Sequence, residues 1–313
     1  MDIHEKIAAD IFWRHGLSFD TAERADGWTN AVWLNGGIAL RLSNIKGSDR
    51  IRREVERCRF LPPSVGYPAN ITFGVTDGYE WSLSERIQGK VLSSVWNGLD
   101  WTEKAAAVRQ IVAIAAGVHS VEIGKVEHIT LRQAWYSPFD RNESLADVER
   151  YVTLKIFTID QGRVLRGILE RFYEYLNNAT SVFNHGDITP DNLLWHEGTV
   201  ISLLDFEHSV IAPRQLDLHS LVNLALVPND VILQTRKEPE SKEYIQEMIH
   251  LFKPLLAAQN EKDLFLGYNV LFRQRFLEFW LENPEGELNQ CDAYQKLLSF
   301  SDGSGGYLSG LLL

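Results

Sequence analysis

The chain has 313 residues, of which 45% are hydrophobic and 23% charged, a composition typical of a soluble globular protein and not of a disordered or fibrous one. Its 31 basic and 42 acidic residues give a net charge of −11, which disfavours nucleic acid as a partner because such binding depends on Lys and Arg meeting phosphates. Two well-separated cysteines, the lack of a basic and apolar leader, and the lack of an apolar stretch long enough to span a bilayer predict a cytoplasmic protein with no membrane partner.

The first part of the chain is predicted to be rich in strands. Residues 38–42 are apolar except for one arginine and are typical of a β-strand. Residues 71–75 and 79–87 flank a Thr-Asp-Gly turn, and Asp-Gly between apolar runs is a strong signal for a β-hairpin. The charged stretch 52–57 between these strands is a candidate helix. We therefore expect a small lobe built mainly from strands.

The rest of the chain is predicted to be mainly helical. Apolar residues recur at three- and four-residue spacing, the periodicity of a buried helix face, in residues 102–118, 164–176 and 268–280. We place the boundary close to Gly89, which gives a first lobe of residues 1–88 and a second lobe of residues 89–313.

The most informative segment is residues 185–192, which read His-Gly-Asp-Ile-Thr-Pro-Asp-Asn. Residues 193–195 and 200–204 are predicted to form a hairpin around a Glu-Gly turn, and Asp205 follows the second strand. Because the strands of a hairpin run back along each other, this one would bring Asn192 and Asp205 to the same end.

An aspartate, an asparagine and a second aspartate in this order suit phosphoryl transfer from a nucleoside triphosphate. Asp187 is the candidate base, which would accept the proton of the attacking hydroxyl. Asn192 and Asp205 would supply the hard oxygen ligands that hold Mg²⁺ on the phosphates. Taken alone, Asp187 or Asp191 could instead cap a turn. The combination with the hairpin and the Leu-Asp-Phe run favours the catalytic interpretation.

On these residues the chain resembles the aminoglycoside phosphotransferase and choline kinase group, which are distant relatives of protein kinases. Members carry His-Gly-Asp or His-Asn-Asp where protein kinases have His-Arg-Asp, and Asp-Phe or Asp-Trp without the glycine of Asp-Phe-Gly. Both signatures occur here, beginning at His185 and at Asp205. The resemblance covers residues 27–217. It implies an α+β, two-lobed protein kinase-like fold, with a small antiparallel-sheet N-lobe, a larger mainly helical C-lobe, and ATP or GTP with Mg²⁺ between them.

The resemblance also implies nucleotide-binding residues in the first lobe. A loop over the phosphates, which could equally be an ordinary hairpin turn, would contain Gly27, Thr29 and Asn30. The segment that crosses between the lobes would contact the nucleotide base through the backbone of Glu85, Arg86 and Ile87.

Arg41 occupies the position where protein kinases have a lysine that meets the α- and β-phosphates. Arginine keeps the positive charge and adds a planar fork suited to phosphate, but it is bulkier than lysine. We expect it to bind phosphate, with a structural salt bridge as the alternative. Glu54 matches the helix glutamate that pairs with this basic residue, and Glu56, on a different helix face, is the competing assignment.

Four further residues near the motif have expected roles. Glu207 replaces the glycine of Asp-Phe-Gly and could offer another carboxylate to the metal ions or their waters. His185 is expected to be a hydrogen-bonded anchor and not the base. Asp217 is expected to hold the loop through hydrogen bonds, whereas His119 resembles an ordinary core or cap residue.

These expectations define an ATP- or GTP-dependent phosphotransferase that moves the γ-phosphoryl group to a hydroxyl of a small molecule. The leading acceptor is an aminoglycoside-type or other antibiotic. A metabolite such as choline or homoserine and a non-catalytic nucleotide-binding protein are the alternatives, and the lack of an Ala-Pro-Glu segment disfavours protein substrates. Acidic and aromatic residues within 135–140 and 263–282 could form a pocket for a cationic acceptor. The choice of nucleotide and the oligomeric state stay open.

Overall fold

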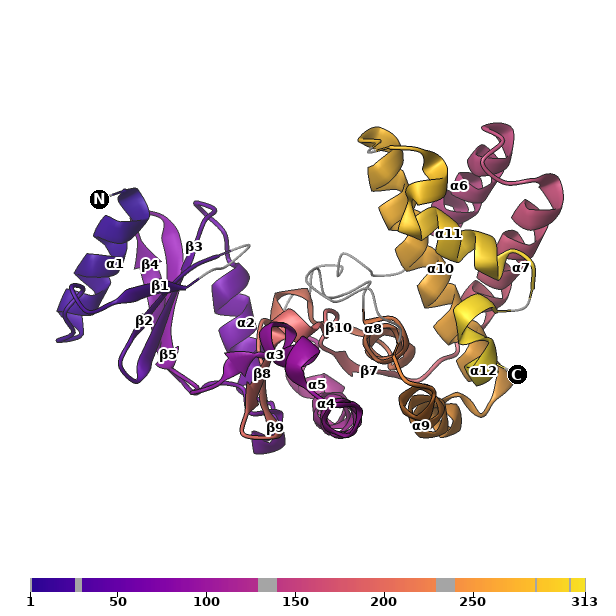
Figure 1. The fold of residues 1–313 in the computed structure, drawn as a ribbon. Coiled ribbons are helices and arrows are strands. Elements are labelled where there is room, and N and C mark those ends of the chain that lie inside the picture. Colours follow the sequence, from indigo (N-terminus) through magenta and orange to yellow (C-terminus); the bar gives the residue numbers. More distant parts are fainter. Residues whose placement is uncertain are drawn as a thin grey trace.

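The computed structural model describes residues 2–25, 30–128, 140–228, 240–284, 286–303 and 305–312. An N-terminal lobe built on an antiparallel sheet is followed by a larger, mainly helical lobe that contains the C-terminus (Figure 1). The predicted α+β, two-lobed arrangement is confirmed.

The N-terminal sheet has five strands in the order β1-β2-β3-β5-β4, and all neighbouring strands are antiparallel. Its strands are β1 (Glu23–Ala25), β2 (Asn30–Asn35), β3 (Ile38–Ser43), β4 (Asn70–Thr76) and β5 (Tyr79–Glu85). Helix α1 (Ile3–Arg14) covers one side and α2 (Arg50–Cys58) lies on the other (Figure 1). Apolar side chains of α1, including Ile11 and Phe12, share a core with Trp33 and Leu40 of the sheet.

The predicted hairpin of the first lobe is present between β4 and β5. Its turn residues Asp77 and Gly78 have φ angles of 53° and 86°. Positive φ at both central positions is the geometry that joins antiparallel strands with the right twist, and it explains the Asp-Gly pair.

The second lobe contains the larger hydrophobic core. Its main helices are α4 (Trp101–His119), α6 (Arg141–Thr153), α7 (Ile159–Leu176), α8 (Gln215–Leu226), α9 (Lys242–Phe252), α10 (Gln259–Glu282) and α11 (Asp292–Phe300). Its shorter helices are α3 (Leu92–Val95), α5 (Ile123–Val126) and α12 (Ser309–Leu312). The three predicted helical segments lie within α4, α7 and α10.

Two small sheets of short strands lie in the second lobe. Strand β6 (Lys90–Val91) pairs with β8 (Leu193–His196), which pairs with β9 (Thr199–Leu203). A second pair joins β7 (Ser181–Asn184) to β10 (Val210–Pro213). The chain therefore enters the second lobe directly after β5, and we keep the boundary at residues 88 and 89 as a proposal.

Helix α2 is fixed to the second lobe as well as to the sheet. The buried Arg57 donates to the carbonyl oxygens of Phe206 (3.2 Å) and Ser209 (3.3 Å). Cys58, at the end of α2, belongs to the core of the helical lobe. One helix thus couples the position of the sheet to that of the segment after β9.

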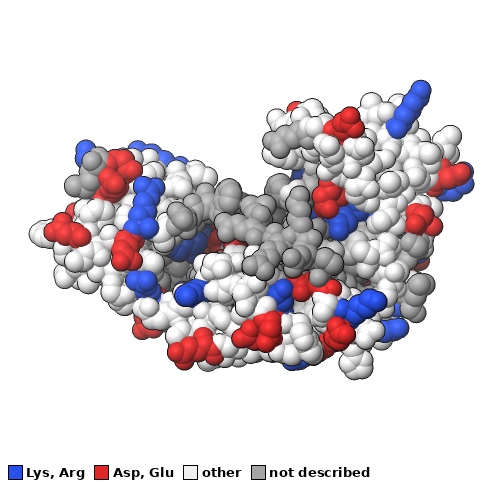
Figure 2. Space-filling model, in the orientation of Figure 1, with Lys and Arg blue, Asp and Glu red and all other residues white. Residues whose placement is uncertain are grey.

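The described helices include none that is both long and apolar enough to cross a membrane. On the face of the molecule shown in Figure 2, the acidic and basic side chains of the described residues are interspersed. The net negative charge is therefore not gathered into one acidic region on that face.

The close approach of α7 and α10 depends on a glycine. A Cβ atom at Gly267 of α10 would lie 2.3 Å from Cδ2 of the buried Phe172 of α7. We therefore expect Gly267→Ala to lower the free energy of unfolding by about 1–3 kcal/mol, because the core there is already filled. Gly167→Ala in the interior of α7 is the matched control, since only the Arg171 side chain lies within 4 Å of its added Cβ.

For Gly167→Ala we expect a gain of about 0.5–1 kcal/mol from helix propensity alone. Urea unfolding of both variants tests the packing, and a Gly267→Ala variant as stable as Gly167→Ala would contradict it.

Candidate active site

The His-Gly-Asp loop runs from β7 to a short 3-10 turn, η3 (Pro190–Asn192). Asp217, at the start of α8, is fully buried and holds this loop through hydrogen bonds. Its Oδ1 accepts from the backbone N–H of Gly186 (2.8 Å), and its Oδ2 accepts from that of His185 (2.9 Å) and from His119 Nε2 (2.9 Å). The predicted loop-holding role of Asp217 is confirmed. His119, expected to be an ordinary core or cap residue, is in fact its ion-pairing partner.

Burial alone would raise the pKa of Asp217. The hydrogen bond and charge of His119 and the hydrogen bond from the Gly186 N–H outweigh burial and lower this pKa below its ordinary value. The loop is therefore anchored on a carboxylate that stays ionised at neutral pH.

His185 uses both ring nitrogens within the protein. Its Nε2 lies 2.8 Å from the carbonyl oxygen of Leu204, to which it donates, and its Nδ1 accepts from the backbone N–H of Asp187 at 3.1 Å. The ring also packs against Phe206, with centroids 4.4 Å apart. Because neither nitrogen is left to take a proton from a substrate, the expectation that His185 is an anchor is confirmed.

Asp187 and Asn192 are joined directly. The Nδ2 group of Asn192 donates to the Asp187 backbone oxygen (3.0 Å) and to its Oδ2 (3.1 Å). The predicted hairpin is also present, and its turn residues Glu197 and Gly198 both have positive φ. These hydrogen bonds orient the Asn192 side chain and leave its Oδ1 as the atom available to a metal ion.

Asp205 comes immediately after this hairpin. Leu204 N–H donates to the backbone oxygen of Asn192 (2.8 Å), which confirms that the hairpin returns the chain to the end where Asn192 lies. Asp205 itself has a left-handed backbone, with φ 62°. Non-glycine residues seldom adopt this conformation, which costs energy and is frequent at functional sites.

The candidate site is crowded with negative charge. Burial raises the pKa of Asp187, and the Glu207 carboxylate raises it further. Burial also raises the pKa of Asp205, to about 6, against the opposing charge of Arg41. A divalent cation bound beside them would offset the cost of both negative charges.

Among the residues that the structure describes, no group of three or more His, Cys, Asp or Glu side chains could hold a metal ion by itself. The candidate ligands Asp205 and Asn192 are one carboxylate and one amide. This small set fits Mg²⁺, which keeps several waters and is usually bound jointly with substrate phosphates. It does not fit a metal enclosed by protein ligands alone.

Glu207 is engaged with two basic side chains. Its carboxylate lies 3.3 Å from His208 Nε2 and 3.9 Å from an Arg50 nitrogen. Burial would raise its pKa, but the hydrogen bond and charge of His208 and the charge of Arg50 lower it, while the pKa of His208 is raised. The metal-binding role of Glu207 stays a prediction, and the sequence had not indicated its two partners.

Arg41 connects the sheet to the candidate metal site. One guanidinium nitrogen lies 2.7 Å from Glu54 Oε1 and the other lies 3.2 Å from Asp205 Oδ1. The same Glu54 oxygen accepts from the hydroxyl of Tyr67 (2.9 Å) and the backbone N–H of Phe206 (3.2 Å). The predicted pair of Arg41 and Glu54 is therefore present. The alternative of a structural salt bridge is also realised, and phosphate binding by Arg41 stays a proposal.

The remaining predicted nucleotide-binding residues lie at or just beyond the ends of strands, or outside the described residues. Gly27 and Thr29 lie outside them. Asn30 is buried and begins β2, where it lies opposite Ser43 of β3.

Two backbone N–H groups of the segment that leaves the sheet form hydrogen bonds within the N-terminal lobe. The backbone N–H of Glu85 donates to Ala69 (3.0 Å) and that of Arg86 donates to Gly37 (2.8 Å). These two N–H groups are thus engaged with the sheet, and Ile87 follows them. Any contact with a nucleotide base would use the carbonyl oxygens of this segment or the N–H of Ile87.

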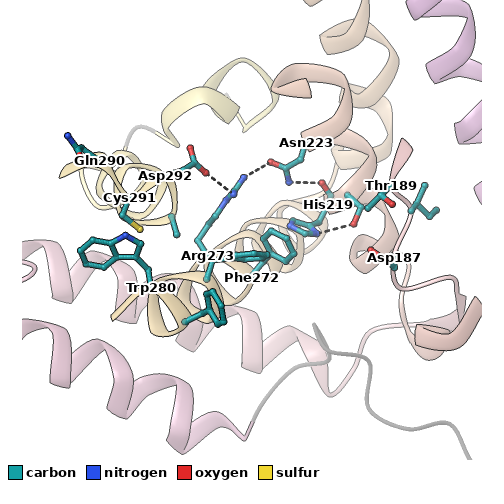
Figure 3. A pocket seen from close by; sticks show the side chains of 15 residues that line it. Asp187, Thr189, His219, Asn223, Phe272, Arg273, Trp280, Gln290, Cys291 and Asp292 are labelled. Atoms are coloured by element: carbon teal, nitrogen blue, oxygen red, sulfur yellow. Dashed lines mark hydrogen bonds and ion pairs between the residues drawn. The ribbon is translucent and has the colours of Figure 1, made fainter. Parts of the chain in front are cut away.

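A cavity of about 410 Å³ extends from Asp187 into the helical lobe. Asp187, Ile188 and Thr189 lie on one side, and the other walls come from α8, α10 and the start of α11 (Figure 3). Sequence patterns had indicated α10 as a core helix and residues 263–282 as part of a possible pocket, but gave no sign that α8 and α11 line a cavity. A group bound there would lie next to the candidate base.

The buried Glu54 and the exposed neighbour Glu56 provide a matched pair for testing the ion pair. Glu56 pairs with Arg52 (3.0 Å), and the two side chains are 30% and 43% exposed. We expect Glu54→Gln to cost about 3 kcal/mol of unfolding free energy because it leaves Arg41 partly uncompensated, whereas Glu56→Gln should cost about 0.5 kcal/mol or less. Urea unfolding checks both values, and equal costs would refute the assignment.

The Asp217 anchor leads to a prediction about pH. A carboxyl group whose pKa is lowered in the folded state contributes stability that is present above its unfolded pKa and lost as the pH falls through its folded pKa. We expect Asp217→Asn to cost about 2 kcal/mol near neutral pH, and the difference from the unchanged protein should shrink below about pH 4. Unfolding measured across this range tests the anchor, and a cost that is independent of pH would argue against it.

Comparisons with known proteins agree with this geometry. Residues 20–241 match the model of a phosphotransferase enzyme family. An aminoglycoside 3'-phosphotransferase from Escherichia coli is 26% identical over 194 residues, which cover 60% of this chain and 69% of that protein.

Solved structures share the fold along nearly the whole chain. The GDP complex of wild-type aminoglycoside 2'-phosphotransferase-IIIa aligns with a TM-score of 0.65 and 13% identity, covering 97% of this chain and 99% of the other. The ternary complex of APH(2")-IIa with streptomycin and ATP aligns with a TM-score of 0.57 and 14% identity, covering 99% of both chains. Identities this low establish the kinase-like fold alone. The family match, in contrast, spans well over half of the sequence and includes every candidate catalytic and metal-binding residue, so the chain belongs to the phosphotransferase enzyme family.

Proposed function

We propose that this phosphotransferase moves the γ-phosphoryl group of ATP or GTP to a hydroxyl group of a small molecule. The observation that carries the proposal is the position of Asp187. Its carboxylate accepts a hydrogen bond from Asn192, a candidate metal ligand, and it also lines the cavity of about 410 Å³. One side chain thus faces both the place expected for the nucleotide and a space that can hold an acceptor.

The proposed reaction gives each residue a defined task. Asp187 accepts the hydroxyl proton as the acceptor oxygen bonds to the γ-phosphorus and the bond to the β-phosphate oxygen breaks. Asn192 and Asp205, with Glu207 directly or through water, would hold Mg²⁺, which when bound neutralises charge on the phosphates. Arg41, positioned by Glu54, would add positive charge beside the same phosphates.

The nucleotide would lie between the lobes, next to the predicted phosphate loop of Gly27 and Thr29 and to Asn30, the first residue of β2. The base would meet the crossing segment at Glu85, Arg86 and Ile87. Related structures contain GDP in one case and ATP in another, which supports a nucleotide without choosing between the two.

Aminoglycoside-type antibiotics are the first acceptors to test because the curated relative is an aminoglycoside 3'-phosphotransferase. Phosphorylation of such a compound would make the protein an antibiotic-resistance enzyme. A metabolite kinase acting on a compound such as choline or homoserine is the alternative within the same chemistry. A non-catalytic nucleotide-binding protein is the alternative outside it, and it has no evident need for the Asp187–Asn192 hydrogen bond.

A matched pair of variants tests the proposed base. We expect Asp187→Asn to lower kcat by about 100- to 10,000-fold with little change in nucleotide affinity, because it removes the proton acceptor but keeps the size of the side chain. Asp191→Asn is the control, since the exposed Asp191 lies in the same short turn and hydrogen-bonds to Ser93. Its kcat should stay close to that of the unchanged protein.

The measurement is ADP or GDP release with Mg²⁺, nucleotide and a panel of hydroxylated compounds. Isothermal titration calorimetry with a non-hydrolysable analogue of ATP or GTP measures nucleotide binding separately. Full turnover by Asp187→Asn would remove Asp187 as the base. Failure of every form of the protein to bind nucleotide would remove the proposed function altogether.

A further inference from the structure

The cavity beside Asp187 has an aromatic wall. Phe272, Phe276, Phe279 and Trp280 all come from α10, and side chains spaced three or four residues apart share one face of a helix. Phe279 is 61% exposed although it is large and apolar. Figure 3 shows Trp280 and Phe272 on the α10 side of the cavity and Asp187 at its other end. Ring faces of this kind suit an apolar or aromatic part of a ligand.

The two opposite charges in the wall compensate each other. Arg273 of α10 and Asp292 of α11 form an ion pair of 3.1 Å, and Arg273 also donates to Asn223 of α8 at 3.2 Å (Figure 3). Apart from Asp187, Asp292 is the one carboxylate among the described residues that line the cavity. An ammonium group entering the cavity would thus meet a carboxylate that is already paired.

The histidine in the wall adds no charge. His219 of α8 is 2% exposed, and burial together with the nearby positive charge of Arg273 lowers its pKa to about 3. It is therefore neutral at physiological pH. Its buried Nε2 has no hydrogen-bond partner within the described part of the chain.

Two acidic residues of α10 form ion pairs outside the cavity. Asp263 pairs with Arg171 at 3.0 Å, and Glu278 pairs with Arg150. Neither carboxylate is among the described residues that line the cavity. The sequence-based expectation of a pocket with both acidic and aromatic residues in this region is met for the aromatic residues and not for these acidic ones.

From this lining, and resting on the proposed phosphotransfer to a hydroxyl, we infer that the acceptor is a hydroxylated compound with an aromatic or extended apolar part and at most one positive charge. A polycation would lose hydration at each ammonium group, and the described lining residues offer it only Asp187, which the proposed reaction uses, and Asp292, which is already paired. A single amine can be accommodated by the ring faces. An apolar surface is buried favourably against the four aromatic side chains.

An acceptor panel sorted by charge tests the inference. The probes are chloramphenicol, which is a neutral aromatic diol, erythromycin, which is a large polyol with one amine, and kanamycin, which is a polycation. We expect acceptor-dependent ADP release and thermal stabilisation with at least one of the first two compounds, and neither with kanamycin. A higher kcat/KM with kanamycin than with the other two compounds would overturn the inference. So would nucleotide binding without binding or turnover of either apolar compound.

Two tryptophans of similar chemistry supply matched variants. Trp280→Ala removes part of the cavity wall, whereas Trp13→Ala removes a side chain on α1 that is 76% exposed. We expect Trp280→Ala to raise the KM of the apolar acceptor about tenfold, with the KM for ATP unchanged, because only the acceptor loses contact area. Trp13→Ala should change neither value. An unchanged acceptor KM in Trp280→Ala would overturn the inference.

A third variant changes the charge of the cavity rim. Because Phe279 is largely exposed, Phe279→Asp should fold normally. We expect it to weaken binding of the apolar acceptor and to strengthen binding of kanamycin. The proposed function is tested separately. Loss of activity with all acceptors in Asp187→Asn, or loss of nucleotide binding, concerns phosphotransfer and not the choice of acceptor. Kanamycin turnover that depends on Asp187 would leave phosphotransfer intact and overturn the acceptor inference alone.

Discussion

The buried carboxylate of Glu54 is the constraint on which the rest of the site depends. It is 1% exposed and meets Arg41 of the sheet, the hydroxyl of Tyr67 and the backbone of Phe206. A charge this deep in the protein is tolerable only with several partners, so these elements must come together whenever Glu54 is ionised. Arg41 extends the same contact to Asp205, and the candidate metal ligand is thereby tied to the sheet. A single anion thus specifies how the two lobes face each other.

The second buried carboxylate, Asp217, works on a smaller scale and by a different means. It accepts two backbone N–H groups of the His-Gly-Asp loop, and His119 compensates its charge. The loop therefore gains its shape from a helix that follows it in the chain and not from its own sequence. Asp187 differs from both, because its carboxylate faces a cavity and burial makes its negative charge costly. Two carboxylates organise the site, and the third is the candidate base.

The sequence sufficed for those parts of the site that are close together in the chain. The hairpin between Asn192 and Asp205 follows from apolar strands and a Glu-Gly turn, and the choice of Glu54 over Glu56 follows from the resemblance to the kinase pattern. Of the cavity beside Asp187, only a contribution from residues 263–282 was predicted in this way. Its walls come from three separate helices, and the aromatic spacing of α10 is the same whether a face meets the core or an open space. His119 was missed because nothing in its local sequence reveals a partner on α8.

The pairing of β6 with β8 has a mechanical consequence. Lys90 and Val91 follow the crossing from the sheet almost directly, and they are bonded to the strand that starts next to Asn192. A swing of the N-terminal lobe about this crossing would pull on that strand, and through the turn at Glu197 and Gly198 on the strand that leads to Asp205. A change in the angle between the lobes would therefore also change the alignment of Asn192 and Asp205, the candidate metal ligands, and with it their proposed contact with the phosphates.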